Sequence, residues 1–403
     1  MSSMDSVLVE DELLANGLTE RIVAHLHERK QDFVEFLQEL VLLESPSLKP
    51  ATLEPVMRLL AGALRSLDYH VTHLNGKRTG GQLYARPCRR VRGQPSQLLL
   101  GHCDTVWGLG TLNKMPVVIE NGCLKGPGVF DMKAGVAQII FALKTLHDLR
   151  LDPPVTPVVL FTSDEEIGSF ESKPYIDRLA RVADRALVLE PALGRSGKIK
   201  TARKGSGDFE IVVKGKAAHA GLAPEEGASA ILELTYVVQK LFALNDPARG
   251  LTVNVGTLDG GIRTNIVAPE SRITVDVRAP TAEDARRIEE TIFALEPTVP
   301  GVTLEIEGCI DRPPMERTPR NQALWKTYRA LGHRLGMTLE EGTSGGASDG
   351  NFTSLYTATL DGLGAVGDGA HAYHEYIDID QTLERCVLLT LLLMTPPLGN
   401  GEA

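Results

Sequence analysis

The chain has 403 residues, and at the usual ~100–200 residues per domain this length predicts two domains. Hydrophobic residues make up 43% and charged residues 23%, an ordinary globular composition that excludes disordered and fibrous proteins. The net charge of -10 disfavours contact with phosphate backbones and anionic lipid, so we expect neither nucleic acid nor a membrane as a partner.

Apolar residues spaced by three and four predict helices over residues 20–43 and 53–67. Short apolar runs at 97–100, 155–162 and 186–189 follow, and a helical segment separates the first two. Buried strands joined by helices predict an α/β catalytic domain, with a mixed sheet flanked by helices.

After residue 205 the pattern changes to the half-buried alternation of antiparallel strands. The predicted order is strand, helix, strand, strand, helix, strand, which is an α+β split-βαβ (ferredoxin-like) arrangement. A Pro-Pro pair ends this pattern, after which the α/β pattern returns. We therefore predict a discontinuous catalytic domain of residues 1–205 and 315–403, interrupted by an inserted lid or dimerisation domain of residues 206–314.

The cysteines and the N-terminus bear on the compartment. The five cysteines are odd in number, widely spaced and without a CxxC pair, which argues against a disulfide framework and a cysteine–zinc site. The N-terminus is acidic and lacks the features of an export signal, and the longest apolar run is shorter than the ~20 residues that a membrane helix needs. We expect a cytoplasmic protein.

Histidines and carboxylates follow the predicted strands. His102 and Asp104 come directly after a buried strand, where α/β sheets place their ligands, and Asp104 would orient the ring of a metal-binding His102. Asp131 lies in a glycine-bracketed turn before a helix, a position also typical of a helix N-cap. Residues 164–166 are three adjacent carboxylates, which repel one another unless a cation neutralises them, although a solvated acidic loop is the alternative.

Two further residues complete this set. Glu190 ends a fourth strand, and His371 lies four residues before Glu375. Neither indicates a function alone. Together with the residues above, they provide two imidazoles and three carboxylates from five loops, a ligand set suited to a pair of divalent zinc ions.

The motifs resemble those of a known family. GHxDTV, GxxDMKxG, DEExG and LEP occur here in the order of the co-catalytic zinc metallopeptidases, the family of glutamate carboxypeptidases, aminoacylases and succinyl-diaminopimelate desuccinylases. GKAAHAG, TNIVAP, DVR, GGxSD and GxxxHxxxEY follow, so that the resemblance covers nearly the whole chain. It implies a zinc-dependent hydrolase of amide bonds.

The resemblance also implies roles for the residues of the metal centre. Two zinc ions, or other divalent ions such as cobalt or manganese, would be bridged by Asp131. Glu190 would share one ion with His102, and Glu166 would share the other with His371. Glu165 would be the general base, Asp104 would support His102, and the peptide bond after Asp131 would be cis.

The inserted domain is implied to supply the remaining groups. His219 alone would more often be an ordinary surface or core histidine, but its match to GKAAHAG implies that it stabilises the oxyanion, commonly in the site of a dimer partner. We therefore expect a homodimer through this domain. Positions that match the family's substrate-binding residues are Arg278, Asn265, Gly345, Gly346 and, in the glutamate carboxypeptidase branch, Arg312.

Three functions follow from this pattern. The first is a carboxypeptidase that releases a C-terminal amino acid, with glutamate preferred, from a peptidyl or N-acyl donor. The second is an N-acyl amino acid deacylase or desuccinylase that uses the same metal centre, because the sequence does not reveal the acyl pocket. The third is a catalytically silent binding protein, which the presence of every ligand and of Glu165 opposes.

Overall fold

The computed structural model describes residues 17–398. The N-terminal segment whose composition argues against an export signal lies outside the described residues. The internal contacts of the chain divide it into two compact units. The first comprises Met1–Thr201, Arg317–Thr343 and Ser348–Ala403, and the second comprises Ala202–Glu316 and Ser344–Ala347.

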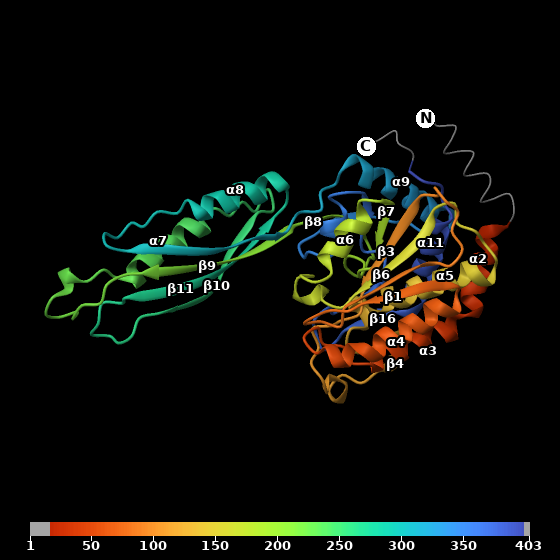
Figure 1. The fold of residues 1–403 in the computed structure, drawn as a ribbon, viewed down its shortest axis with the longest axis horizontal. Coiled ribbons are helices and arrows are strands. Elements are labelled where there is room, and N and C mark those ends of the chain that lie inside the picture. Colours follow the sequence, from red (N-terminus) through yellow and green to blue (C-terminus); the bar gives the residue numbers. More distant parts are fainter. Residues whose placement is uncertain (1–16, 399–403) are drawn as a thin grey trace. The chain divides into compact units, whose positions relative to one another are not determined.

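A six-stranded mixed sheet lies at the centre of the first unit, in the order β1-β2-β6-β3-β7-β14 (Figure 1). β3 is parallel to β6 and β7, and β7 is parallel to β14, whereas β2 is antiparallel to both of its neighbours. β6 is buried along its whole length, as expected for a strand covered on both faces. The strands are β1 (Tyr69–Leu74), β2 (Gln82–Pro87), β3 (Ser96–His102), β6 (Thr156–Thr162), β7 (Ala183–Val188) and β14 (Ala358–Leu360).

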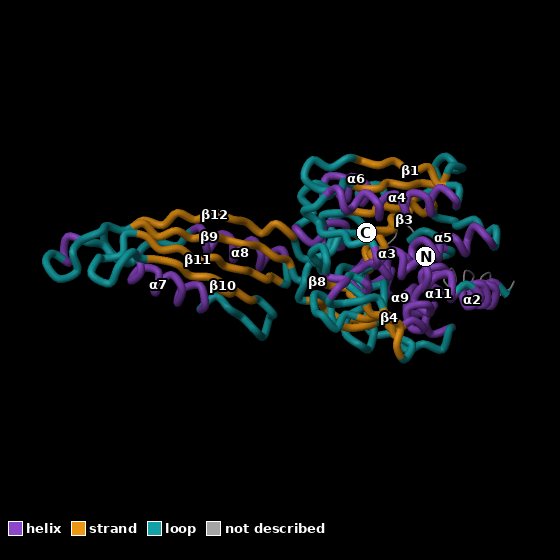
Figure 2. Tube along the Cα trace, turned by 90° about the horizontal axis from the view of Figure 1, so that it is seen from below, coloured by secondary structure: helices purple, strands orange, loops and turns teal. Residues whose placement is uncertain are grey.

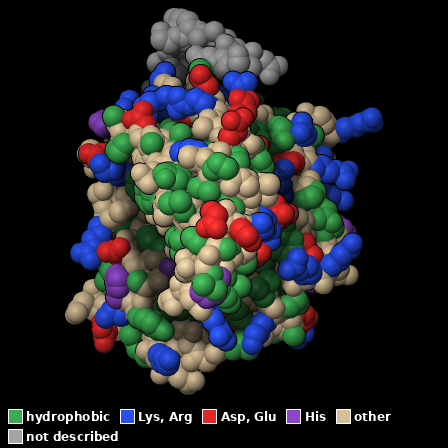
Figure 3. Space-filling model, turned by 90° about the vertical axis from the view of Figure 1, so that its left-hand side faces the viewer, with side chains coloured by type: hydrophobic (Ala, Val, Ile, Leu, Met, Phe, Trp, Pro, Cys, Tyr) green, Lys and Arg blue, Asp and Glu red, His purple; other side chains and the backbone are tan. Residues whose placement is uncertain are grey.

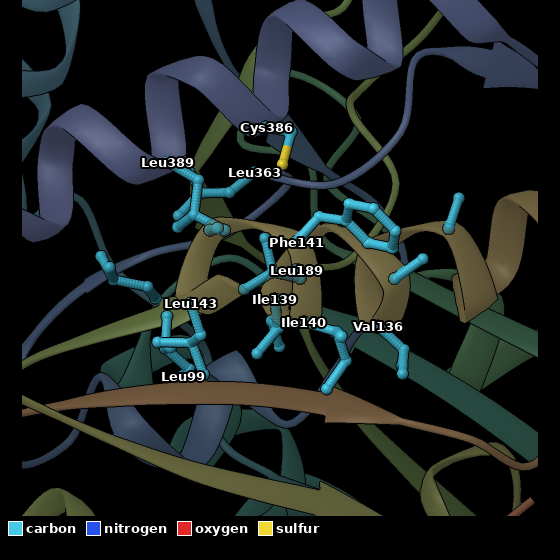
Figure 4. Close-up of a cluster of buried hydrophobic side chains, with 14 of the residues drawn as sticks. Leu99, Val136, Ile139, Ile140, Phe141, Leu143, Leu189, Leu363, Cys386 and Leu389 are labelled. Carbon is cyan, nitrogen blue, oxygen red and sulfur yellow. The ribbon is translucent and has the colours of Figure 1, made fainter. Parts of the chain in front are cut away.

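Helices pack against this sheet and against each other. α5 lies between Leu99 of β3 and residues Cys386 and Leu389 of α11, so both of its faces are buried (Figure 4). The predicted α/β class is therefore confirmed. The helices are α2 (Leu18–Glu28), α3 (Lys30–Leu42), α4 (Pro50–Ser66), α5 (Ala134–Asp148), α6 (Lys173–Ala180), α9 (Pro319–Arg334), α10 (Gly350–Thr353) and α11 (Ile379–Leu393).

The single helix predicted over residues 20–43 is instead two helices. Arg29 separates α2 from α3, with φ of -95° and ψ of 8°. No glycine or proline marks this break, and Ile22, Leu26, Phe33 and Leu37 all face the core. Apolar spacing therefore does not reveal it.

Two smaller sheets complete the strands outside the insertion. One has the order β15-β16-β5-β4, and its hairpin β15–β16 presents residues 369–375 in a loop. The other pairs β13 with β8. The strands are β4 (Val118–Glu120), β5 (Cys123–Lys125), β8 (Ile199–Arg203), β13 (Glu341–Ser344), β15 (Gly367–Asp368) and β16 (Tyr376–Asp378).

The second unit has the predicted order of strand, helix, strand, strand, helix, strand. Its antiparallel sheet has the order β10-β11-β9-β12 (Figure 2), which is the ferredoxin-like arrangement that the alternation predicted. Ser229 and Thr281 begin its two helices, because each side chain accepts a hydrogen bond from a backbone N–H of the first turn. The elements are β9 (Gly205–Lys214), α7 (Ala230–Phe242), β10 (Thr252–Gly260), β11 (Glu270–Ala279), α8 (Ala282–Phe293) and β12 (Thr303–Arg312).

Acidic and basic side chains are interspersed over the face drawn in Figure 3. Within residues 17–398, no helix is long and apolar enough to cross a membrane. All five cysteines lie in this part of the chain, and all are free thiols.

Candidate metal centre

Loops at the ends of strands in the first unit bring the five predicted ligands together. His102 is the last residue of β3, Glu166 follows β6, Glu190 follows β7, Asp131 precedes α5, and His371 lies between β15 and β16. His371 has φ of 60°, a left-handed conformation that is uncommon outside glycine and that occurs often at functional sites.

Asp131 lies between the two histidines. Its Oδ1 is 3.2 Å from His102 Nε2, and its Oδ2 is 3.5 Å from His371 Nε2. Each histidine also has a second carboxylate, since His102 Nε2 is 3.4 Å from Glu190 Oε1 and His371 Nε2 is 3.1 Å from Glu166 Oε2. Two histidine–carboxylate pairs therefore share one aspartate.

These separations fit metal coordination. Ligand bonds of ~2.0–2.1 Å in a tetrahedral site put neighbouring donor atoms about 3.3–3.4 Å apart, which is close to the distances observed. Glu166 Oε1 is buried and has no hydrogen-bond partner among the described residues, so a cation would satisfy it. Glu165 also offers an oxygen within 4.8 Å of donor atoms of His102 and Glu190.

The hydrogen bonds of His102 determine which ring nitrogen faces the carboxylates. Its Nδ1 lies 3.0 Å from the backbone oxygen of Asp104 and 3.4 Å from the Asp104 carboxylate. A proton on Nδ1 leaves the Nε2 lone pair free for a metal. Asp104 also accepts from Ser47 Oγ and from the backbone N–H groups of Glu165 and Glu166, so it fixes the loop that carries them.

Glu375 holds the turn around Asp131, a role that sequence reasoning missed. Its carboxylate accepts hydrogen bonds from the backbone N–H groups of Gly128, Phe130 and Asp131, and from the Trp107 indole. The Asp131–Met132 peptide bond is cis, as the resemblance implies. The signal in the sequence is the GxxxHxxxEY motif, in which Glu375 is present beside the candidate ligand His371.

The carboxylates of the centre favour the protonated form of both histidines when no cation is present. Burial disfavours a charged His102, but hydrogen bonds to carboxylates, Asp104 foremost, outweigh burial and hold its pKa well above the ordinary value. Hydrogen bonds to Asp131 and Glu166 raise the pKa of His371 to about 10. Burial raises the pKa of Glu166 to about 7.

Metal binding is therefore expected to displace protons. At pH 8 His371, with a pKa of about 10, carries a proton that a cation must remove, and the raised pKa of His102 favours a second, so saturation with zinc should release at least one proton per chain. The affinity for zinc should fall as the pH is lowered through 7, because Glu166 then also binds a proton. A pH-indicator titration measures the release. His371→Ala should release about one proton fewer, and proton-neutral binding would contradict this interpretation.

Comparison with known proteins identifies the family. The sequence profile of Peptidase family M20/M25/M40 matches residues 98–395. The chain belongs to this family. This M20 chain is 29% identical over 379 residues to carboxypeptidase G2 from Pseudomonas sp. (strain RS-16), covering 92% of this chain and 90% of that protein. It is 27% identical over 365 residues to succinyl-diaminopimelate desuccinylase from Gluconacetobacter diazotrophicus, covering 85% and 91%.

The fold of this M20 chain is also found in a solved structure. Aminopeptidase PepT from Bacillus cereus ATCC 10987 superposes with a TM-score of 0.75 at 22% identity, covering 91% of this chain and 98% of that one. The family that the motifs predicted is thus confirmed. The M20 chain is a metal-dependent enzyme of the metallopeptidase and amidohydrolase class.

The remaining predicted residues lie in the second unit of the M20 chain, and the structure separates them into two groups. His219 and Asn265 are in neighbouring loops, because the Ala220 N–H donates to the Asn265 backbone oxygen. His219 Nδ1 accepts from the N–H groups of Gly221 and Leu222. A neutral ring therefore carries its proton on Nε2, which makes this exposed nitrogen a hydrogen-bond donor.

The second group lies at the other end of β11. Arg278 and Arg312 flank Ser206 on the two neighbouring strands, and Arg312 is only 5% exposed. The Arg278 guanidinium binds both oxygens of Asp276, and its Nη1 has no hydrogen-bond partner among the described residues. Asn265 precedes β11, whose eight residue steps from Glu270 to Arg278 span roughly 27 Å.

The glycine loop belongs to this second group. The Lys204 N–H donates to the Ser344 backbone oxygen, and Arg203 donates to the Gly346 backbone oxygen. Gly345 and Gly346 are exposed, whereas Ser348 is buried and its N–H is already bound to Asn351. The Gly345 and Gly346 N–H groups have no backbone partner among the described residues, which leaves them as donors for an anion.

Proposed function

We propose that this M20 enzyme releases a C-terminal amino acid, with glutamate preferred, from a peptidyl or N-acyl donor, and that it uses two zinc ions. The observation that carries the proposal is Asp131, which gives one carboxylate oxygen to each of the two histidine–carboxylate pairs. The similarity to carboxypeptidase G2, which extends over 92% of the chain, supports cleavage at the amide bond of the C-terminal amino acid.

The chain supplies the proton transfers. When bound, the two ions would polarise the scissile carbonyl and acidify the attacking water. Glu165 takes the proton of that water and delivers it to the leaving amine. Asp104 accepts a hydrogen bond from the Glu165 backbone N–H and thereby fixes the position of this base. The Nε2 proton of His219 stabilises the oxyanion that forms on the substrate.

The second unit supports a homodimer. β10 is an edge strand, and α7 packs beside it with exposed apolar side chains that a partner would cover. β9 begins at residue 205 and extends about 30 Å before the chain reaches the His219 loop. We further propose, from the GKAAHAG match, that His219 serves the metal centre of the partner. The exposed side chains are Ile231, Leu232, Tyr236 and Phe242 of α7 and Leu258 of β10.

Recognition of a free carboxylate gives the test of the substrate class. Arg278, oriented by Asp276, and the Gly345–Gly346 backbone are proposed to bind the α-carboxylate of the amino acid that leaves. A charge-assisted bond contributes about 1.5–3 kcal/mol, so amidation of that carboxylate should lower kcat/KM roughly ten- to a hundredfold or more.

Substitution of Arg278 by Met should flatten this preference without changing the metal content. Arg272→Met is the matched control, because Arg272 lies on the same strand and pairs with Glu210 at the surface. Kinetics on one acyl amino acid and its amide compare the variants. Equal hydrolysis of acid and amide by the unmodified enzyme would contradict the carboxypeptidase proposal.

A second candidate is an N-acyl amino acid deacylase or desuccinylase. The similarity to succinyl-diaminopimelate desuccinylase over 85% of the chain favours it. Both candidates use the same metal centre and differ in the acyl group, so succinyl and peptidyl donors of one amino acid distinguish them. The five free thiols support our further proposal of a cytoplasmic location.

A further inference from the structure

A single buried carboxylate holds both ends of the loop that carries Glu165 and Glu166. Asp349 is 3% exposed, and its Oδ2 accepts a hydrogen bond from Thr162 Oγ1 at 3.2 Å. Its Oδ1 accepts from Ser169 Oγ. Thr162 is the last residue of β6 and Ser169 ends the turn, so the loop is bracketed by two hydroxyl groups that share one acceptor.

The loop itself is a tight turn that depends on its ends. The Ser169 N–H donates to the Asp164 backbone oxygen at 2.7 Å, and Ser169 has φ of 57°, a conformation that is unusual for a residue with a side chain. Asp164 Oδ1 is buried, and no residue from 17 to 398 forms a hydrogen bond with it. The left-handed residue and the unsatisfied carboxylate oxygen are both unfavourable, so the turn is stable only when neighbouring residues constrain it. Asp349 is one of these residues.

The segment around Asp349 is itself anchored. Ser348 Oγ donates to Asp361 at 2.5 Å, and the Ser348 N–H donates to Asn351 at 2.8 Å. The residues just before Ser348, residues 344–347, belong to the second unit. Asp349 therefore lies one residue inside the first unit, next to the loop that we propose to bind the substrate carboxylate.

We propose that Asp349 is a positioning residue, which sets the orientation of Glu165 and Glu166 by fixing Thr162 and Ser169. Hydrogen bonds from hydroxyl groups to an ionised carboxylate are strong in a buried environment, where water does not compete. Residues that orient metal ligands typically change metal affinity or activity ten- to a hundredfold when they are replaced. The inference rests on the roles proposed above for Glu165 and Glu166.

The first test needs neither metal nor substrate. Amide hydrogen exchange of residues 165–169 is measured in the metal-free protein, for Asp349→Ala and for the control Asp361→Asn. Asp361 is buried in the same network, where it accepts a hydrogen bond from Ser348 Oγ, and Asn keeps an acceptor oxygen for that hydroxyl. We expect at least about tenfold faster exchange in Asp349→Ala and less than about twofold change in the control. Unchanged exchange in Asp349→Ala, or equal changes in both variants, would overturn the proposal.

The second test measures the consequence for the centre. Asp349→Ala should lower the affinity for the zinc shared by Glu166 and His371 about ten- to a hundredfold. The affinity for the zinc of His102 and Glu190 should change by less than about threefold. Asp349→Asn retains one acceptor oxygen and the side-chain volume, so it should fold and show an intermediate effect. An Asn variant identical to Ala, or equal weakening of both ions, would indicate a general structural role. Because exchange is measured without catalysis, failure of the proposed substrate class leaves this result interpretable.

Discussion

Replacement of Glu165 by Gln is expected to lower kcat by at least about a thousandfold while both metal sites still bind. The amide keeps the size of the side chain but no longer accepts the proton of the attacking water, and general-base catalysis is worth up to ~10⁴-fold. The Glu165 backbone N–H donates to Asp104, and this bond does not depend on the side chain, so the loop should keep its conformation. Turnover and zinc content are measured on the same preparation.

The neighbouring carboxylate provides the matched control. Glu166 Oε2 is 3.1 Å from His371 Nε2, so Glu166→Gln should lose metal at that site as well as activity. The pair of variants distinguishes a base from a ligand at adjacent positions. A Glu165→Gln enzyme with full activity, or one that loses zinc as Glu166→Gln does, would contradict the role assigned to Glu165.

Replacement of His219 by Ala is expected to lower kcat about a hundredfold or more. Nδ1 of His219 is occupied by two backbone N–H groups, so the variant removes a donor nitrogen that is already oriented. Loss of one oxyanion donor typically costs 10²–10³ in kcat. Zinc content should not change, because His219 is in the second unit and the candidate ligands are in the first.

Mixed dimers test whether His219 acts in the partner's site. A dimer of one His219→Ala chain and one Glu165→Gln chain has one intact site only if the histidine crosses between subunits. Random exchange at equal amounts gives half mixed dimers, so about a quarter of the unmodified activity should return. The variants mixed without exchange serve as the control. No recovery after proven exchange would place His219 in the site of its own chain.

Local sequence predicted the elements and the candidate ligands because both depend on neighbouring residues. The ends of β3, β6 and β7 follow from apolar runs, and His102, Glu166 and Glu190 stand at those ends. Asp131 was compatible with either a ligand or a helix cap. In the structure its two oxygens face His102 and His371, and no side-chain cap hydrogen bond is present at α5.

Residues that act through distant partners were not predictable in this way. Glu375 binds the turn at Gly128, 247 residues earlier, and Asp349 binds Ser169, 180 residues earlier. Such hydrogen bonds leave no periodic pattern, because they are formed only when the fold brings the segments together. For the same reason, the motifs do not reveal that β11 separates Asn265 from Arg278 within one chain.

The metal centre is proposed to release a C-terminal amino acid. The most direct measurement is product identification by mass spectrometry, with zinc-loaded enzyme and a panel of peptidyl and N-acyl amino acids, before and after complete removal of metal by a chelator. We expect the C-terminal amino acid as the product, glutamate fastest, with activity lost on chelation and restored by zinc. Release of an N-terminal residue, or undiminished activity in metal-free protein, would contradict the account.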